Sequence, residues 1–137
     1  MQTFLIHPTF ESTRLLDPKR HGKQRVEART IYRILTGVVD GGGWKKHPAV
    51  LMWRGYEDAL ALYYNMTLSS WIAKRYENNM DYLPIVGRRV EFPHWLGDKR
   101  LHSSHRAALL RKNHRFYRAY CWKEEPEINY YWPEGKS

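Results

Sequence analysis

The sequence predicts an all-α protein, a compact single domain over residues 1–137 with about three main helices, long irregular loops and an extended aromatic C-terminal tail. Apolar side chains recur at helical spacing in three segments. Few stretches show the alternation typical of strands, and prolines and glycines concentrate between the periodic segments. With 137 residues, 42% of them apolar, the chain is long enough for one modest core. It contains no internal repeat that would indicate a second domain.

The first helix is predicted to begin at Asp17 and Pro18, because aspartate can cap free amides and proline fits the first helical turn. Gly37 is the expected end, and Gly22 should weaken the helix locally by about 1 kcal/mol relative to alanine. The spacing assigns four apolar residues to the buried side: Val26, Ile31, Ile34 and Leu35.

From Pro48 to Ile72 the apolar positions keep helical spacing for more than six turns, on the order of 3.6 residues each. This predicts one long core helix whose aromatic side chains pack inward, with Trp53 and Tyr56 near its start partly exposed. The preceding glycine run, residues 41–43, lacks the context of a nucleotide-binding loop and is predicted to be a flexible connector.

Residues 79–97 form a predicted long connection, because prolines and other turn residues punctuate them. A third helix should begin near Asp98 or Ser103. It should bury Leu101, Ala108, Leu109 and Tyr117, and face His105, Arg106 and Lys112 outward. The tail NYYWP cannot continue as a helix through Pro133 and is expected to pack as an extended segment.

Basic residues exceed acidic ones by 23 to 14, which gives a net charge of +9 and indicates a polyanionic partner. The stretch from Pro18 to Arg33 has a single acid, Glu27, among six cations. On a helix, one face would carry Arg20, Lys23, Glu27 and Thr30. A surface that only grips phosphates gains nothing from a carboxylate, so Glu27 is predicted either to have a chemical role or to form a helix salt bridge with Lys23.

The single cysteine, Cys121, excludes an intramolecular disulfide framework and fits a reducing compartment. The sequence shows neither a secretory signal nor an apolar run long enough to span a membrane. The protein is therefore predicted to be soluble, monomeric and cytoplasmic, near the nucleoid or in the host cell if phage-encoded. His102 and His105 are three residues apart, but no metal motif completes a site, so no metal and no cofactor are predicted.

Four strings carry a resemblance that spans nearly the whole chain: LLDPKRHGKQRVEA (15–28), HPAVLMWRGYE (47–57), SHRAALLRKN (104–113) and YYWP (130–133). They resemble the pyrimidine-dimer DNA glycosylase family, that of phage T4 endonuclease V, and most closely its bacterial and phage branch. The resemblance implies a helical protein that binds and kinks double-stranded DNA at a cyclobutane pyrimidine dimer. It also implies cleavage of the glycosidic bond, followed by strand cleavage through β-elimination.

The same resemblance implies that an N-terminal amine attacks the sugar to form an imine, and that Glu27 matches the essential glutamate of the first helix. An α-amine suits this task because its ordinary pKa, about 7.7 to 8.0, leaves a neutral fraction at physiological pH. The chain departs from the T4 enzyme, where the initiator methionine is removed to expose a small residue. Here Gln2 follows Met1. The amine would then be that of Met1, or the lyase step would be absent or use Lys19 or Lys23.

The residues predicted to contact DNA combine cations of the first and third helices with two neutral donors: Arg20, Lys23, Gln24, Arg25, His105, Arg106 and Lys112. Two of these have another interpretation. Gln24 could simply face solvent, and His105 could be a buried hydrogen-bonding residue.

Three functions remain open at this stage. The leading one is a DNA-repair glycosylase, with or without lyase activity, that acts on a damaged pyrimidine. The second is a glycosylase for another modified or hypermodified pyrimidine. The third is a DNA- or RNA-binding module that lacks the chemistry, which the departure at Gln2 would favour.

Overall fold

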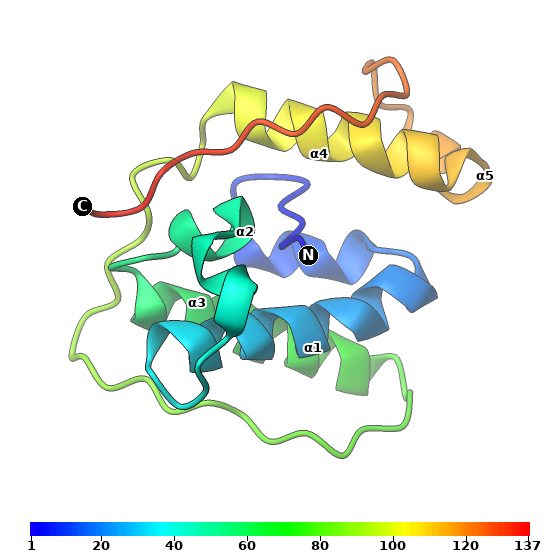
Figure 1. Cartoon of the computed structure of the whole chain (residues 1–137). Coiled ribbons are helices and arrows are strands. Elements are labelled where there is room, and N and C mark those ends of the chain that lie inside the picture. Colours follow the sequence, from blue (N-terminus) through cyan, green and yellow to red (C-terminus); the bar gives the residue numbers. More distant parts are fainter.

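Three long helices form the frame of the protein: α1 (Pro18–Leu35), α3 (Glu57–Ala73) and α4 (Lys99–Lys112) (Figure 1). The computed structural model describes residues 1–137. The remaining helical elements are short: η1 (Phe10–Leu15), η2 (Gly42–Lys46), α2 (Pro48–Leu51), α5 (His114–Tyr117) and η3 (Arg118–Tyr120). No strand forms, so the all-α prediction is confirmed. No helix is both long and apolar enough to cross a bilayer.

Helix α1 begins at Pro18 as predicted and ends at Leu35, two residues before Gly37, which has a positive φ of 78°. The predicted capping by Asp17 is wrong in detail. Its side chain makes no cap bond and instead accepts from the Tyr117 hydroxyl and from Arg20. Val26 is exposed, contrary to prediction, because the buried positions of α1 follow a different stripe: His21, Gln24, Ala28, Ile31 and Ile34.

The predicted long central helix is two helices, α2 and α3, separated by residues 52–56. Gly55 causes the break, since its φ of +87° lies outside the helical region. The aromatic side chains nevertheless pack as expected. Trp53 and Tyr56 are buried at the break rather than partly exposed, so that expectation is wrong.

Helices α1 and α3 pack along their lengths around the main hydrophobic cluster, which also includes the residues of α2 and Trp95. Gly22 permits a close approach, because a Cβ atom there would lie 3.0 Å from the Trp71 ring. A smaller cluster joins Phe4 and Ile6 to α4 through Leu109 and Leu110, and to α5 through Tyr117.

The C-terminal tail runs antiparallel to α4 and is extended, as predicted (Figure 1). Its backbone is fixed by bonds from Glu127 N to Ala107 O (3.1 Å) and from Tyr131 N to Ser104 Oγ (3.1 Å). The connection between α3 and α4 has no regular structure, which confirms the predicted long loop. The tail and α4 together cover the N-terminal segment from one side.

Candidate active site

The first six residues form an extended segment between α1 and α4, without a strand partner (Figure 1). Residues 2–6 are buried. Buried backbone amides and carbonyls need hydrogen-bond partners, and here the partners are side chains of the three long helices. Because these contacts hold the segment from both sides, they also fix the position of the chain's first residue.

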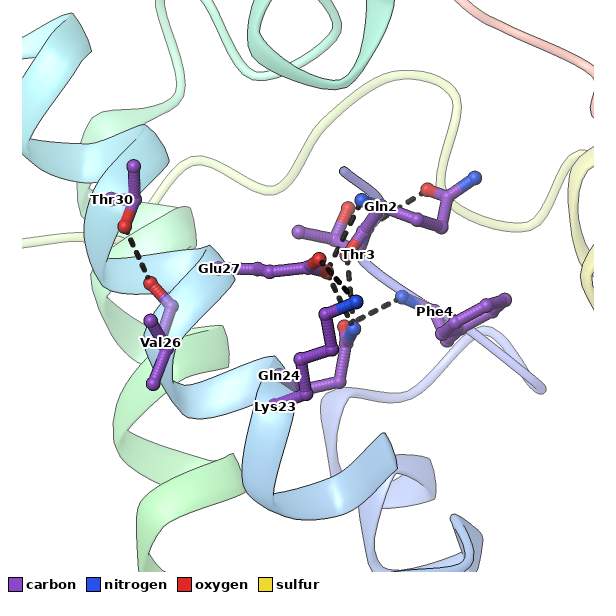
Figure 2. Close-up of polar contacts among 8 residues, drawn as sticks. All are labelled: Gln2, Thr3, Phe4, Lys23, Gln24, Val26, Glu27 and Thr30. Atoms are coloured by element: carbon purple, nitrogen blue, oxygen red, sulfur yellow. Dashed lines mark hydrogen bonds and ion pairs between the residues drawn. The ribbon is translucent and has the colours of Figure 1, made fainter. Parts of the chain in front are cut away.

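Glu27 holds the beginning of this segment. Its Oε2 accepts from the Gln2 backbone N–H (3.2 Å) and from Gln24 Nε2 (3.1 Å), while Oε1 lies 3.8 Å from Lys23 Nζ (Figure 2). The Lys23–Glu27 salt bridge thus forms, but it is only one of three contacts of the carboxylate. Since the α-amine of Met1 lies one residue before the Gln2 N–H, Glu27 and the first nitrogen of the chain are neighbours.

Gln24 is buried and every hydrogen-bonding group of its amide is used. Its Oε1 accepts from Phe4 N (2.9 Å), and its Nε2 donates to Gln2 O (2.9 Å) as well as to Glu27 (Figure 2). Oε1 also accepts from the Tyr63 hydroxyl (2.8 Å). The expectation of a solvent-facing glutamine is therefore wrong. Gln24 has no free donor for DNA, and it positions both Glu27 and the N-terminal segment.

Helix α4 holds the other end of the segment. His105 Nδ1 accepts from Leu5 N (2.9 Å), His102 Nδ1 bonds to Leu5 O (2.9 Å), and Arg106 donates to Ile6 O (2.7 Å). Burial, followed by the charges of His102 and Arg106, lowers the pKa of His105 to about 3, so this ring is neutral at physiological pH.

The predicted outward orientation of His105 is wrong, because the residue is fully buried. Arg106 is also not a free phosphate contact. Its guanidinium pairs with Glu124 (2.9 Å from Nη2 to Oε2) as well as with Ile6 O, and its side chain is only 20% exposed. Both residues act on the N-terminal segment from inside the protein.

A cavity of about 330 Å³ opens beside Met1 and Glu27. Its lining is rich in cations from α1 and α4 and has one aromatic hydroxyl from the tail: Met1, Gln2, Phe4, Lys19, Arg20, Lys23, Gln24, Glu27, Lys112 and Tyr130. The structure thus brings together the two predicted catalytic residues and three of the predicted phosphate contacts, namely Arg20, Lys23 and Lys112.

Arg25, like His105 and Arg106, is a predicted DNA contact that does not line the cavity. Its guanidinium carbon lies 4.2 Å from the centroid of the Trp71 ring, and Nη1 donates to Asn78 Oδ1 (3.0 Å). It helps to attach the α3–α4 connection to α1. The position follows from helical spacing, since residue 25 is about 100° around the axis from residue 24.

Two further residues near the cavity, His47 and Tyr130, are not among the predicted catalytic and DNA-binding residues. The pKa of Tyr130 is raised, first by burial; Arg20 opposes this shift and Glu27 adds to it, so the phenol lies close to both charges. The pKa of His47 is lowered, first by burial and then by the charge of the N-terminal amine, while Glu27 opposes the shift. Both belong to strings that carried the family resemblance, but neither has a spacing that marks a site by itself.

This arrangement suits chemistry on a charged, sugar-containing ligand. Several cations offer contacts to phosphate, and a carboxylate lies among them where positive charge on a sugar could be stabilised. A primary amine one residue from the carboxylate's backbone donor is a nucleophile of the right type.

The comparisons agree with this geometry. A family model described as pyrimidine dimer DNA glycosylase matches residues 1–83, which include the N-terminal segment, α1, α2 and α3. No curated protein and no solved structure matches the chain. Because the matched part covers more than half of the 137 residues and contains Met1, Gln24 and Glu27, the chain belongs to the pyrimidine dimer DNA glycosylase family.

Proposed function

We propose that the protein is a DNA glycosylase that removes a damaged pyrimidine, such as one in a cyclobutane pyrimidine dimer, and then cleaves the strand by β-elimination. The Met1 amine is the nucleophile and Glu27 is the acid–base residue. The observation that carries this proposal is the short distance of 3.2 Å between Glu27 Oε2 and Gln2 N, at the edge of a cation-lined cavity.

In the first step the neutral amine of Met1 attacks the C1′ atom of the sugar, and the bond from C1′ to the pyrimidine nitrogen breaks. The base leaves with the bonding electron pair and takes up a proton. The attacking nitrogen loses both of its protons, one taken up by the departing base and one by O4′ as the C1′–O4′ bond breaks, and an imine forms between Met1 and C1′. Glu27 stabilises the positive charge that develops on the sugar during this step.

In the second step a base removes a proton from C2′, and the electron pair expels the 3′ phosphate, which breaks the strand. Glu27 is suited to this step because it lies beside the amine that becomes the imine nitrogen. Water then releases the sugar from Met1 and restores the amine.

The remaining lining of the cavity suits a DNA backbone. Lys23 and Lys112 are exposed, whereas Arg20 lines the cavity while paired with Asp17 (3.2 Å) and with 18% of its side chain exposed. They come from α1 and α4, so they approach the cavity from two sides. Such contacts fix the position of the strand but do not read its sequence. Selection of the lesion would then come from how easily damaged DNA can be distorted to bring its sugar to the amine.

The decisive experiment measures incision of ultraviolet-irradiated plasmid in EDTA, with undamaged plasmid as the control. We expect incision of the irradiated plasmid only. Substitution of Glu27→Gln should reduce incision by roughly 10²- to 10⁴-fold, the usual contribution of acid–base catalysis, while DNA binding is retained. Glutamine can still accept from Gln2 N, so the N-terminal segment should stay in place.

Borohydride trapping identifies the reacting amine. We expect a covalent protein–DNA adduct that maps to the first residue, together with mass spectrometry showing that Met1 is retained. An adduct on Lys19 or Lys23 would contradict the role of Met1. Unchanged incision by the Glu27→Gln variant would contradict the role of the carboxylate.

A further inference from the structure

We propose that Trp44 is a base-stacking residue: its indole ring packs against a nucleobase of the DNA next to the lesion, and so positions the damaged sugar at the amine. The inference rests on the proposed function. It concerns the surface around the predicted connector, here called the Trp44 turn and defined as residues 38–46.

Trp44 is unusually exposed for a side chain of its size and type. Half of its surface is accessible, whereas the other five tryptophans are buried or half-buried. It lies on an open hollow of about 370 Å³ that it shares with Gly43, Lys46 and His47. A large exposed aromatic ring beside lysines suits the π-face of a nucleobase and the adjacent phosphates.

The Trp44 turn has a defined local structure within the stretch that was predicted to be a connector. Gly41 has a φ of +79°, and a Cβ atom there would lie 2.9 Å from Ile34 of α1. Asp40 accepts from Gly42 N (3.2 Å) and pairs with Lys45 (2.6 Å), and the following residues form the 3₁₀ turn η2. The indole is thus held outward on a fixed turn, which lowers the entropic cost of using it in binding.

A chain of aromatic contacts leads from Trp44 to the cavity of Glu27. Its ring lies 5.3 Å from that of His47, His47 lies 5.7 Å from Trp132, and Trp132 lies 5.5 Å from Tyr130, which lines the cavity. An independent observation agrees, because the charges of the Met1 amine and of Glu27 both affect the pKa of His47. A DNA strand with its sugar in the cavity would therefore have a neighbouring nucleotide within reach of Trp44.

His47 supports the ring position. Its Nδ1 accepts from Ala49 N (3.0 Å) at the start of α2, so the neutral ring carries its proton on Nε2. The lowered pKa keeps the ring neutral at physiological pH, and no positive charge is added next to the amine. His47 is thus a positioning residue between the Trp44 turn and the tail.

The test measures binding of a duplex that contains one thymine dimer, over a series of salt concentrations. Loss of one stacked base should weaken binding by the Trp44→Ala variant by roughly 5- to 150-fold. The salt dependence should not change, because no phosphate contact is lost. Trp44→Phe should recover most of the affinity. A 2-aminopurine base next to the dimer should fluoresce more strongly with Trp44→Ala than with the wild type.

Tyr82→Ala is the matched control, since Tyr82 is similarly exposed but lies on the α3–α4 connection, where its hydroxyl bonds to Ser69 of α3 (3.0 Å). It should bind like the wild type. Binding by Trp44→Ala within twofold of the wild type, or an equal loss in Tyr82→Ala, would overturn the proposal. If the wild type forms no adduct with any lesion but Trp44→Ala still loses affinity, the stacking role stands and the proposed chemistry fails.

Discussion

The N-terminal segment is held from two sides, and the two sides use charge differently. On the α1 side, Glu27 keeps part of its carboxylate at an open cavity, and Lys23 extends into solvent with 68% of its side chain exposed. On the α4 side, Arg106 and Glu124 are paired with each other and largely covered. Both helices are basic in the sequence, yet three of the six cations of α1 line the cavity, whereas Lys112 is the one cation of α4 that does.

This comparison shows that the number of cations in a helix differs from the number that are free to contact a ligand. Gln24, His105 and Arg106 were predicted to contact DNA. Instead, their side chains form hydrogen bonds with backbone groups of residues 2–6. An extended segment without a strand partner creates this need, because each buried amide and carbonyl must find a side chain. In this protein the polar side chains on the buried faces of α1 and α4 hold the N-terminal segment and thereby position the Met1 amine.

The largest effect is expected for Gln24→Leu, which removes the central contact on the α1 side. Phe4 N–H and Gln2 C=O lose their partners in a buried place, at a cost of about 1–3 kcal/mol each. We expect the free energy of unfolding in urea to fall by about 3 kcal/mol. The remaining folded protein should trap DNA poorly, because its amine is displaced. Full stability in this variant would show that the segment is held mainly by α4.

A smaller loss is expected for Arg106→Met, the corresponding change on the α4 side. Ile6 C=O and Glu124 lose a partner, but the contact is only partly buried and Glu124 still accepts from the Ser103 hydroxyl (2.9 Å), so we expect a loss of about 2 kcal/mol in the free energy of unfolding. The salt dependence of DNA binding should stay that of the wild type, since this guanidinium is already paired. A shallower salt dependence would identify Arg106 as a phosphate contact after all.

Acid should weaken the α4 side through His105. In the unfolded chain this ring has its ordinary pKa of 6.5 and binds a proton below it, whereas the folded protein keeps it neutral down to about pH 3. The unfolded state therefore binds more protons as the pH falls from 7 toward 4, and stability decreases on the order of 1 kcal/mol per pH unit. Urea unfolding at pH 7, 6 and 5 measures this slope.

His21 should contribute in the same direction, because burial, its largest cause, lowers its pKa to about 4. A His105→Gln variant separates the two, since it should lose only the part of the slope that comes from His105. An identical slope in the variant and the wild type would mean that His105 does not titrate on unfolding.

The sequence predicted what depends on local pattern. The start of α1, its end before Gly37, the long connection and the extended tail follow from proline, glycine and helical spacing. The break between α2 and α3 could not be found this way, because one glycine with a positive φ interrupts a pattern that otherwise continues.

The residues of the site were likewise predictable only in part. Glu27 stood out as an isolated acid among cations, and the cavity has Arg20 and Lys23 beside it. Gln24, His105 and Arg106 could not be placed, since their partners are backbone groups about 20 to 100 residues away in the chain, which no spacing reveals. His47 and Tyr130 were missed for a related reason: their relation to the amine depends on how α2 and the tail pack.

The smallest effect on stability is expected for Lys112→Gln. This variant changes a cation of α4 that has no partner in the protein, whereas Arg106 is paired. Lys112 is exposed, lines the cavity and forms no ion pair, so the free energy of unfolding should stay within about 0.5 kcal/mol of the wild type. Binding to DNA should weaken for damaged and undamaged duplexes alike, and the slope of log K against log salt should fall by about 1. Arg106→Met and Lys112→Gln lie on the same helix and each removes one positive charge. A stability loss without a slope change in the first, and the reverse in the second, would show that α4 has one cation for the fold and another for DNA.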